Sequence, residues 1–299
     1  ILSIHPLPEA ELNQLKADTV VVSQFQPFND EQVVGQLRSK QLRALSLDMI
    51  PRTTLAQAMD VLSSMASIAG YRAVLEAATH LPRYFPMMIT AAGSIRPASV
   101  LVLGAGVAGL QAIATARRLG AQVEAFDTRS AAKEEVKSLG AKFVEVEGAK
   151  DDTGAGGYAV EQSEEFLQRQ RGEVQARAIK SDVIITTAQV RGRKAPILVP
   201  EETVQQMKPG SVIVDLASST GGNCALSEDG KTVVKHGITI IGNSDLAGRM
   251  PQDASRLYSN NVINFLKLLV KDGELHLDMD NEIIRGAYIT AEPATTENS

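Results

Sequence analysis

Cysteine is almost absent from this sequence, and its scarcity limits the chemistry available to the chain. Cys224 is the single cysteine among 299 residues. An internal disulfide and a zinc site built from several thiolates are therefore excluded, and the composition is typical of a reducing compartment. We interpret Cys224 as a small buried hydrophobic residue, and no metal site is expected.

Long apolar runs and an excess of positive charge are also missing. No stretch of about 18 apolar residues exists, so a membrane-spanning helix is not expected, and no cleavable secretion signal is visible. The net charge of -5 leaves no basic surface for nucleic acid. Hydrophobic residues make up 44% of the chain, enough for one large or two ordinary domains. The chain starts at Ile1, which predicts a fragment or a processed product.

Three glycines separate a predicted strand from a predicted helix. The strand is the apolar run ASVLVLG at 98–104, and the helix covers 107–120. In a dinucleotide-binding turn, Gly104 would permit the tight bend, Gly106 the approach of backbone amides to a pyrophosphate, and Gly109 close packing of helix on strand. The spacing therefore predicts dinucleotide binding.

An acidic residue follows the next predicted strand, AQVEAF at 121–126. Asp127 is placed to accept hydrogen bonds from the adenosine ribose hydroxyls, and its charge repels a 2′-phosphate. We therefore expect NAD(H) rather than NADP(H). Arg129 is interpreted as an exposed arginine at a helix start, although it is able to receive a phosphate if Asp127 turns away.

The alternation of strands and helices continues downstream. Apolar runs predict strands within 137–146, 182–188, 210–217 and 237–242, and a long polar helix covers 158–181. The pattern predicts an α/β fold with a doubly wound parallel sheet, whose ligands lie beyond the carboxyl ends of the strands. The predicted cofactor-binding residues are Gly104, Gly106, Val107, Ala108, Gly109, Asp127, Thr128, Arg129, Thr187, Ala188, Asp215 and Leu216.

Two glycine-rich loops stand out from this regular pattern. The loop at 148–161 is long and polar. It is interpreted either as a lid that carries Tyr158 or as an ordinary surface loop. The loop at 218–224 follows the fifth strand, and its paired glycines allow a ligand to approach the backbone closely.

The segment at 51–80 has the spacing of a helix with an unusual polar face. Gln57 has two open interpretations, a capping box with Thr54 or a ligand contact. Arg52 and Asp60 are compatible with a simple ion pair. The predicted apolar face consists of Leu55, Met59, Leu62 and Ala66, and the uncharged or acidic polar face of Gln57, Asp60, Ser63, Ser64 and Ser67.

Several separate motifs, in order along nearly the whole chain, resemble one family. They are LDMIPRTTLAQAMDVLSSMASIAGYRAV, ITAAGSIRPASVLVLGAGVAGLQAIATARRLGA, FDTR, GGYA, ITTA, GSVIVDLASSTGGNC and GRMPQDAS with LYSNN. Together they resemble the NAD(H)-binding component of proton-translocating nicotinamide nucleotide transhydrogenase, an alpha-subunit type of domain. The match departs from the family pattern at TTAQVRGRKAP and at GNSDLAG.

The resemblance implies two Rossmann-like domains, of which the first lacks its front. Residues 1–55 and 258–299 would form the incomplete first domain, and residues 56–257 the NAD(H)-binding domain with its linking helices. The segment 248–273 would be a long helix that returns the chain to the first domain. The tail at 291–299 is expected to be disordered.

The implied activity is hydride transfer from NADH, held here, to NADP+ on a partner component, coupled to proton movement by a membrane-spanning component. Neither partner is in this sequence, and a homodimer is expected. The protein would be soluble and peripheral to a membrane, on the bacterial cytoplasmic or organellar matrix side. The nicotinamide site would be lined by Arg52, Gln57, Asp60 and Ser63, with Gln57 on the carboxamide or ribose and Arg52 paired to Asp60. Tyr158 would close over the nucleotide.

Two other functions remain open at this point. Alanine dehydrogenase shares the architecture, but its catalytic histidine is expected near VVSQFQPF at 21–28, where this chain has no histidine. A non-catalytic NAD(H) sensor would need the same pyrophosphate turn. The polar face at 51–80 favours a site where the nicotinamide reacts.

Overall fold

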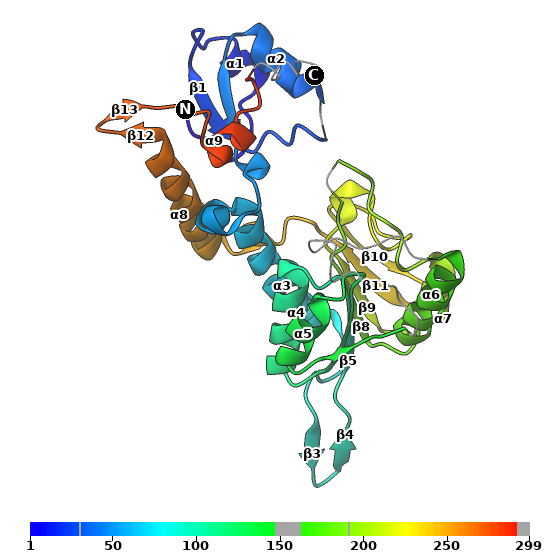
Figure 1. Cartoon of the computed structure of the whole chain (residues 1–299). Coiled ribbons are helices and arrows are strands. Elements are labelled where there is room, and N and C mark those ends of the chain that lie inside the picture. The colour runs from blue at the N-terminus through cyan, green and yellow to red at the C-terminus, as the bar shows by residue number, and fades with distance from the viewer. Residues whose placement is uncertain (30, 147–162, 191, 292–299) are drawn as a thin grey trace. The chain divides into compact units, whose positions relative to one another are not determined.

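The computed structural model describes residues 1–29, 31–146, 163–190 and 192–291 (Figure 1). The chain divides into two compact units. The smaller unit consists of Ile1–Met65 with Gln252–Ser299, and the larger unit is Ala66–Pro251. Within the described ranges, no helix is both long and apolar enough to cross a membrane.

The larger unit is built around a seven-stranded sheet in the order β10-β11-β9-β8-β5-β6-β7. All neighbouring strands are parallel except β10, which pairs antiparallel with β11 at one edge. This confirms the predicted α/β fold. The strands are β5 (Ser99–Leu103), β6 (Gln122–Phe126), β7 (Lys142–Phe143), β8 (Val183–Thr186), β9 (Val212–Asp215), β10 (Lys231–Lys235) and β11 (Ile238–Gly242).

All six strands predicted for this sheet are present, and β10 is the strand of the sheet that the sequence did not predict. The central strands are β-branched runs buried on both faces, which is why their apolar pattern is continuous. In β10 only Val233 is partly buried, so the strand has no apolar run that could reveal it.

Helices cover both faces of this sheet (Figure 1). One core joins the sheet to residues of α3, α4 and α5, and the other joins its opposite face to residues of α6 and α7. The long polar helix begins later than predicted, because the Ser163 side chain accepts the Phe166 N–H and caps α6. The helices are α3 (Val61–His80), α4 (Val107–Arg118), α5 (Ala132–Ser138), α6 (Glu164–Ala178) and α7 (Glu201–Gln206).

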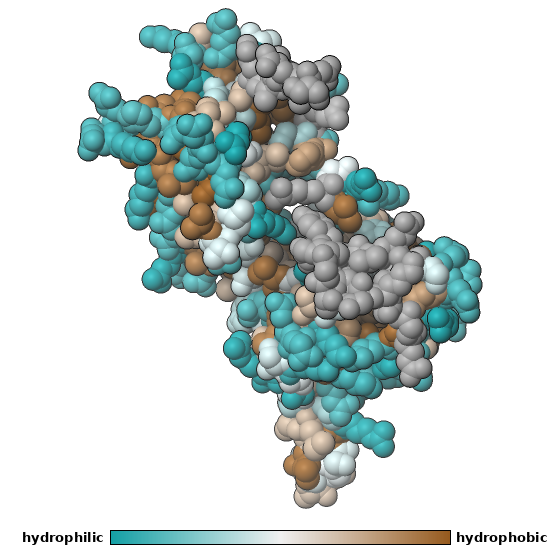
Figure 2. All heavy atoms as spheres, in the orientation of Figure 1, coloured by the Kyte–Doolittle hydropathy of each residue, from teal (hydrophilic) through white to brown (hydrophobic). Residues whose placement is uncertain are grey.

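A two-stranded hairpin, β3 (Met88–Thr90) with β4 (Gly93–Ile95), projects from the larger unit. Its surface shows apolar side chains in Figure 2. Ile89 is 77% exposed, and Met87 and Ile95 are exposed as well. This hairpin is not part of the predicted sheet.

The smaller unit contains a short parallel pair, β1 (Val20–Ser23) and β2 (Arg43–Ser46). Tyr258, Phe265 and Leu269 of the long helix α8 pack in the same core as Val22 and Leu45 of these strands. The remaining elements are α1 (Glu9–Leu12), α2 (Glu31–Ser39), η1 (Leu47–Met49), η2 (Thr54–Met59), α8 (Pro251–Leu269), β12 (Val270–Lys271), β13 (Glu274–Leu275) and α9 (Glu282–Ala287).

Candidate nucleotide-binding site

The sheet register brings the predicted nucleotide-binding segments of the larger unit to one edge. Leu103 pairs with Phe126 and with Thr186, and Thr186 pairs with Asp215. Gly104, Asp127, Thr187 and Leu216 each follow one of these residues. The chain runs from β5 outward to β6 and returns to β8 on the other side of β5, so the strand order reverses at β5. Ligands of doubly wound sheets lie at such a reversal.

Two glycines of the turn are required by the fold itself. Gly104 has φ +102°, and a Cβ there would lie 2.4 Å from Thr187 Oγ1. At Gly109 a Cβ would lie 1.8 Å from the carbonyl oxygen of Gly104. The first glycine therefore makes the bend and the third lets α4 pack against the end of β5, as the sequence predicts.

Gly106 is different, because nothing in the fold requires a glycine there. Its φ of -77° and ψ of -168° are open to any residue, and a Cβ would meet no atom within 4 Å. Gly106 is the N-cap of α4, and no side chain caps the helix. The open space thus lies at a helix N-terminus, where amides and the helix dipole attract phosphate. The turn fits the pyrophosphate of a dinucleotide.

Asp127 lies beside this turn and is held by it. Its Oδ2 accepts the Ala105 N–H at 2.7 Å, and its Oδ1 accepts the Arg129 backbone N–H at 2.9 Å. The Arg129 guanidinium adds Nε to Oδ1 and Nη2 to Oδ2, both at 3.0 Å. Burial alone would raise the pKa of Asp127, but the hydrogen bonds from Arg129 and Ala105 outweigh it and hold the pKa below its usual value.

Asp215 was expected among the nucleotide ligands, but its side chain is fully buried. Its Oδ1 accepts the Thr186 hydroxyl and the Ala217 N–H. Its Oδ2 accepts Asn223 N–H, Cys224 N–H and the Ser227 hydroxyl, at 2.6 to 2.9 Å. Leu216 is likewise buried, in the apolar core. These two side chains therefore stabilise the backbone at this edge of the sheet and are not accessible to a ligand.

Asn223 is a residue that the sequence did not single out. It is fully buried, its Oδ1 accepts the Ala188 N–H, and its Nδ2 donates to the carbonyls of Ala188 and Pro196. It therefore ties the backbone after β8 to the loop after β9. Its signal in the sequence is weak, an asparagine after two glycines, because its partners are distant in the chain.

Gly70 is a second residue missed at this site. A Cβ at Gly70 would lie 2.1 Å from the carbonyl oxygen of Ala108, so α3 packs directly on the first turn of α4. The sequence shows a glycine inside a helix, which gives no indication of its partner.

The other predicted cofactor-binding residues differ in exposure. Val107 and Thr128 are exposed, and Ala108 and Thr187 are half-buried.

The four predicted nicotinamide residues all lie in the smaller unit. Thr54–Met59 form the 3-10 helix η2, and α3 begins after it at Val61. The segment is therefore not one continuous α-helix, which overturns the predicted apolar position of Leu55 and removes one of the two interpretations of Gln57. Leu55 is 77% exposed instead of on an apolar face, and no side chain caps η2, so the capping box of Gln57 with Thr54 is absent.

Asp60 caps α3 in place of pairing with Arg52. Its carboxylate accepts the backbone N–H of Ser63 at 2.9 Å and the Ser63 hydroxyl at 2.6 Å. Arg52 and Gln57 are exposed. No ion pair joins Arg52 to Asp60 in the described part of the chain. Tyr158 lies outside the described residues.

Cys224 is buried, as expected from the sequence. Burial, with the negative charge of Asp215 nearby, raises the pKa of its thiol to about 11. We therefore predict that the folded protein does not react with Ellman's reagent at pH 8, whereas the urea-unfolded chain releases one equivalent of thiolate. Reaction in the native buffer at the rate of the unfolded chain would contradict this prediction.

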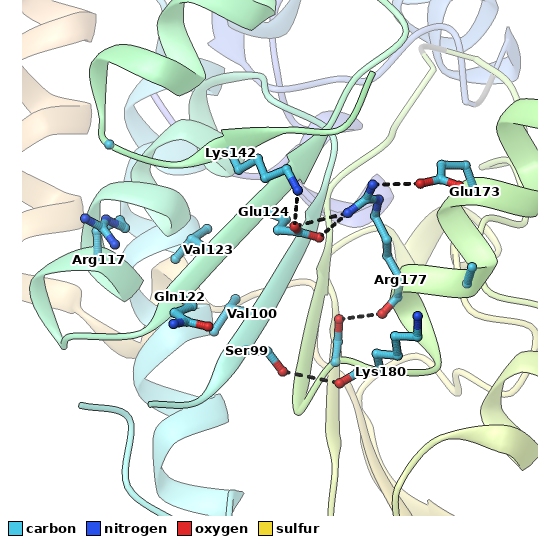
Figure 3. Close-up of a pocket in the computed structure, with 13 residues that line it drawn as sticks. Ser99, Val100, Arg117, Gln122, Val123, Glu124, Lys142, Glu173, Arg177 and Lys180 are labelled. Atoms are coloured by element: carbon cyan, nitrogen blue, oxygen red, sulfur yellow. Dashed lines mark hydrogen bonds and ion pairs between the residues drawn. The ribbon is translucent and has the colours of Figure 1, made fainter. Parts of the chain in front are cut away.

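A cavity of about 600 Å³ lies at the other end of the sheet (Figure 3). Ser99 and Gln122, at the amino ends of β5 and β6, line it. Arg177 donates to Glu124 and to Glu173, and Lys142 pairs with Glu124. Because the amino ends of β5 and β6 line this cavity and the glycine turn follows the carboxyl end of β5, the cavity is separate from the turn.

Comparison with known proteins identifies the family. Two family models match, the alanine dehydrogenase/PNT N-terminal domain at residues 1–69 and the alanine dehydrogenase/PNT C-terminal domain at residues 73–298. An NAD(P) transhydrogenase subunit alpha protein from Rhodospirillum rubrum is 47% identical over 288 residues, which cover 95% of this chain and 75% of that protein.

A transhydrogenase crystal structure from Sinorhizobium meliloti superposes with a TM-score of 0.86 at 42% identity, over 95% of this chain and 77% of that one. Alanine dehydrogenase is more distant. The Bacillus subtilis protein is 24% identical over 96% of this chain and 71% of its own length. The chain therefore belongs to the alanine dehydrogenase/PNT family and, within it, to the NAD(P) transhydrogenase alpha-subunit branch.

Proposed function

We propose that this transhydrogenase component binds NAD(H) at the turn of Gly104, Gly106 and Gly109 and gives hydride to NADP+ on a partner component. One observation carries the proposal. Gly106 has ordinary backbone angles and open space beside it, at an uncapped helix N-terminus. A glycine that the fold does not need is explained by a ligand that approaches the backbone there.

Other predicted residues also have proposed roles in nucleotide binding. Asp127 accepts the adenosine ribose hydroxyls, as its position after β6 suggests. Gln57 contacts the nicotinamide carboxamide or ribose, beside Arg52 and Ser63. Asp60 holds Ser63 through the bonds described above, and Tyr158 contributes its side chain to nucleotide binding.

Hydride transfer places modest chemical demands on the protein. The nicotinamide supplies and accepts the hydride at its C4 atom. The chain's own residues must bind the two ends of the nucleotide, orient the ring and exclude water. The polar side chains of Arg52, Gln57 and Ser63 suit positioning more than proton transfer.

The proposal extends to the partners that the resemblance implies. The Rhodospirillum rubrum relative is named as a portion of an alpha subunit, which supports assembly with other components. We propose an NADP(H)-binding component, a membrane-spanning proton-translocating component at a membrane surface, and a second copy of this chain. Light scattering of the purified protein tests the homodimer.

Gly106→Ala tests the pyrophosphate cradle. We expect the Kd for NADH to rise by about tenfold or more, because a methyl group enters the space that the phosphates need. The free energy of unfolding should change little, since the new Cβ meets no atom. NADH fluorescence titration and urea unfolding measure the two quantities.

Gly172→Ala is the matched control for this variant. Gly172 lies on the exposed side of α6, and a Cβ there also meets nothing within 4 Å. We expect NADH binding equal to that of the wild type. If Gly106→Ala also binds NADH normally, the cradle is not at this turn.

A stopped-flow experiment tests the reaction. The protein with bound NADH is mixed with a purified NADP(H)-binding component that carries an NADP+ analogue. Fast transfer that needs both proteins supports transhydrogenation. NADH oxidation that instead depends on pyruvate and ammonium would favour alanine dehydrogenase. Tight NADH binding without either reaction would favour a sensor.

A further inference from the structure

The carboxylate of Asp127 has no free acceptor position in this structure. A carboxylate accepts about four hydrogen bonds, two at each oxygen. Oδ1 accepts the backbone N–H and the Nε–H of Arg129, and Oδ2 accepts the Ala105 N–H and the Nη2–H of Arg129. A ribose diol that binds Asp127 must therefore displace a donor that is already there.

The four donors differ in how easily they are displaced. The Ala105 and Arg129 amides are parts of the backbone of the glycine turn and of the segment after β6, so they stay. The guanidinium is on a flexible side chain that is 39% exposed, whereas Asp127 is 9% exposed. Because water reaches the guanidinium, it can be solvated when it leaves, so it is the donor most easily displaced.

A second acid favours release of the guanidinium. Glu135, on α5, lies close enough for its charge, together with that of Asp127, to raise the pKa of Arg129. Asp127 is the hydrogen-bonded partner of Arg129, and Glu135 acts on it through its charge alone. A guanidinium that leaves Asp127 keeps a negative partner nearby.

We propose that Arg129 occupies, in the free protein, the positions on Asp127 that the ribose hydroxyls of NAD(H) take. This inference rests on the proposed function. Nucleotide binding exchanges the two guanidinium bonds for two hydroxyl bonds. Arg129 is thus a competitor of the ribose, and its ion pair with Asp127 lowers the affinity of the site for NAD(H).

The same ion pair determines which dinucleotide is accepted. While Asp127 is present, its charge repels a 2′-phosphate and its bidentate pair occupies the guanidinium of Arg129. When Asp127 is removed, the free fork of Arg129 is a good partner for a phosphate. Exclusion of NADP(H) therefore depends both on the charge of Asp127 and on its hold on the Arg129 guanidinium.

The experiment is a double-mutant cycle with two ligands. The Kd values of NADH and NADPH are measured by fluorescence titration for the wild type, Arg129→Ala, Asp127→Ser and the double variant. We expect Arg129→Ala to bind NADH about two- to fivefold more tightly, because no competitor has to leave. Asp127→Ser should bind NADH about tenfold or more weakly.

The NADPH titrations test whether the pair of Asp127 with Arg129 excludes NADP(H). Asp127→Ser should bind NADPH about tenfold more tightly than the wild type does, and the double variant should lose this gain because the phosphate partner is gone. Lys231→Ala controls for the loss of one positive charge, since Lys231 is an exposed cation on β10. We expect it to leave the NADH affinity unchanged or slightly weaker.

The outcomes separate this inference from the proposed function. If the wild type does not bind NADH, the proposed function fails. If the wild type binds NADH but Arg129→Ala binds it equally or more weakly, Arg129 is not a competitor and the inference is overturned. Equal NADPH affinity of Asp127→Ser and the double variant would overturn the role of Arg129 in dinucleotide choice.

Discussion

Gly109→Ala is expected to lower the free energy of unfolding by about 3 kcal/mol or more, or to prevent folding. The added Cβ would lie 1.8 Å from the carbonyl oxygen of Gly104 and 2.8 Å from its carbonyl carbon. Both atoms are backbone, so neither can turn aside as a side chain would. Relief requires α4 to move away from the end of β5, and the two elements share one core.

The sign of this effect is opposite to that of helix propensity. Alanine inside a helix is favoured over glycine by about 1 kcal/mol, so propensity alone predicts stabilisation. Urea unfolding followed by circular dichroism gives the measurement, and Gly106→Ala, three residues earlier, is the control with open space. Equal stability of Gly109→Ala and the wild type would mean that this backbone contact does not fix the distance between α4 and β5.

Asp215→Asn has the other large expected effect, a loss of about 3 kcal/mol or more of unfolding free energy. An amide replaces one acceptor oxygen by an NH₂ group, which would face donors in either orientation. Three donors meet at Oδ2 and two at Oδ1, and three of the five are backbone amides that cannot rotate. Buried N–H groups would thus be left without acceptors.

Glu202→Gln provides the matched control, since Glu202 is an exposed carboxylate in the first turn of α7. We expect a change within about 0.5 kcal/mol for this variant. Urea unfolding of both variants, beside an NADH titration, separates loss of stability from loss of affinity. An Asp215→Asn protein as stable as the wild type would show that the network tolerates an amide.

The features that the sequence predicted are those whose cause is local. The strands of the larger sheet are continuous buried runs, and Gly104, Gly109 and Asp127 lie at fixed spacings from β5 and β6. Each pattern reflects contacts between elements that are close in the chain. The strands and the glycine contacts were therefore predictable without knowledge of the rest of the fold.

The features that were missed depend on distant partners. Gly70 is determined by Ala108, and Asn223 by Ala188 and Pro196. Nothing in the neighbouring sequence marks these contacts. The start of α3 was misplaced for a related reason, because Thr54–Met59 has the spacing of an α-helix but forms a 3-10 helix before Asp60 caps α3.

The two edges of the large sheet limit its growth. β7 is two residues long, so it offers little backbone to a further strand. β10 is longer and leaves Val234 exposed, but Lys231 and Lys235 occupy its two ends. Charged ends oppose the pairing of a second chain with an exposed edge strand. The lysines of β10 thus protect the sheet against aggregation, although this strand contributes little to the core.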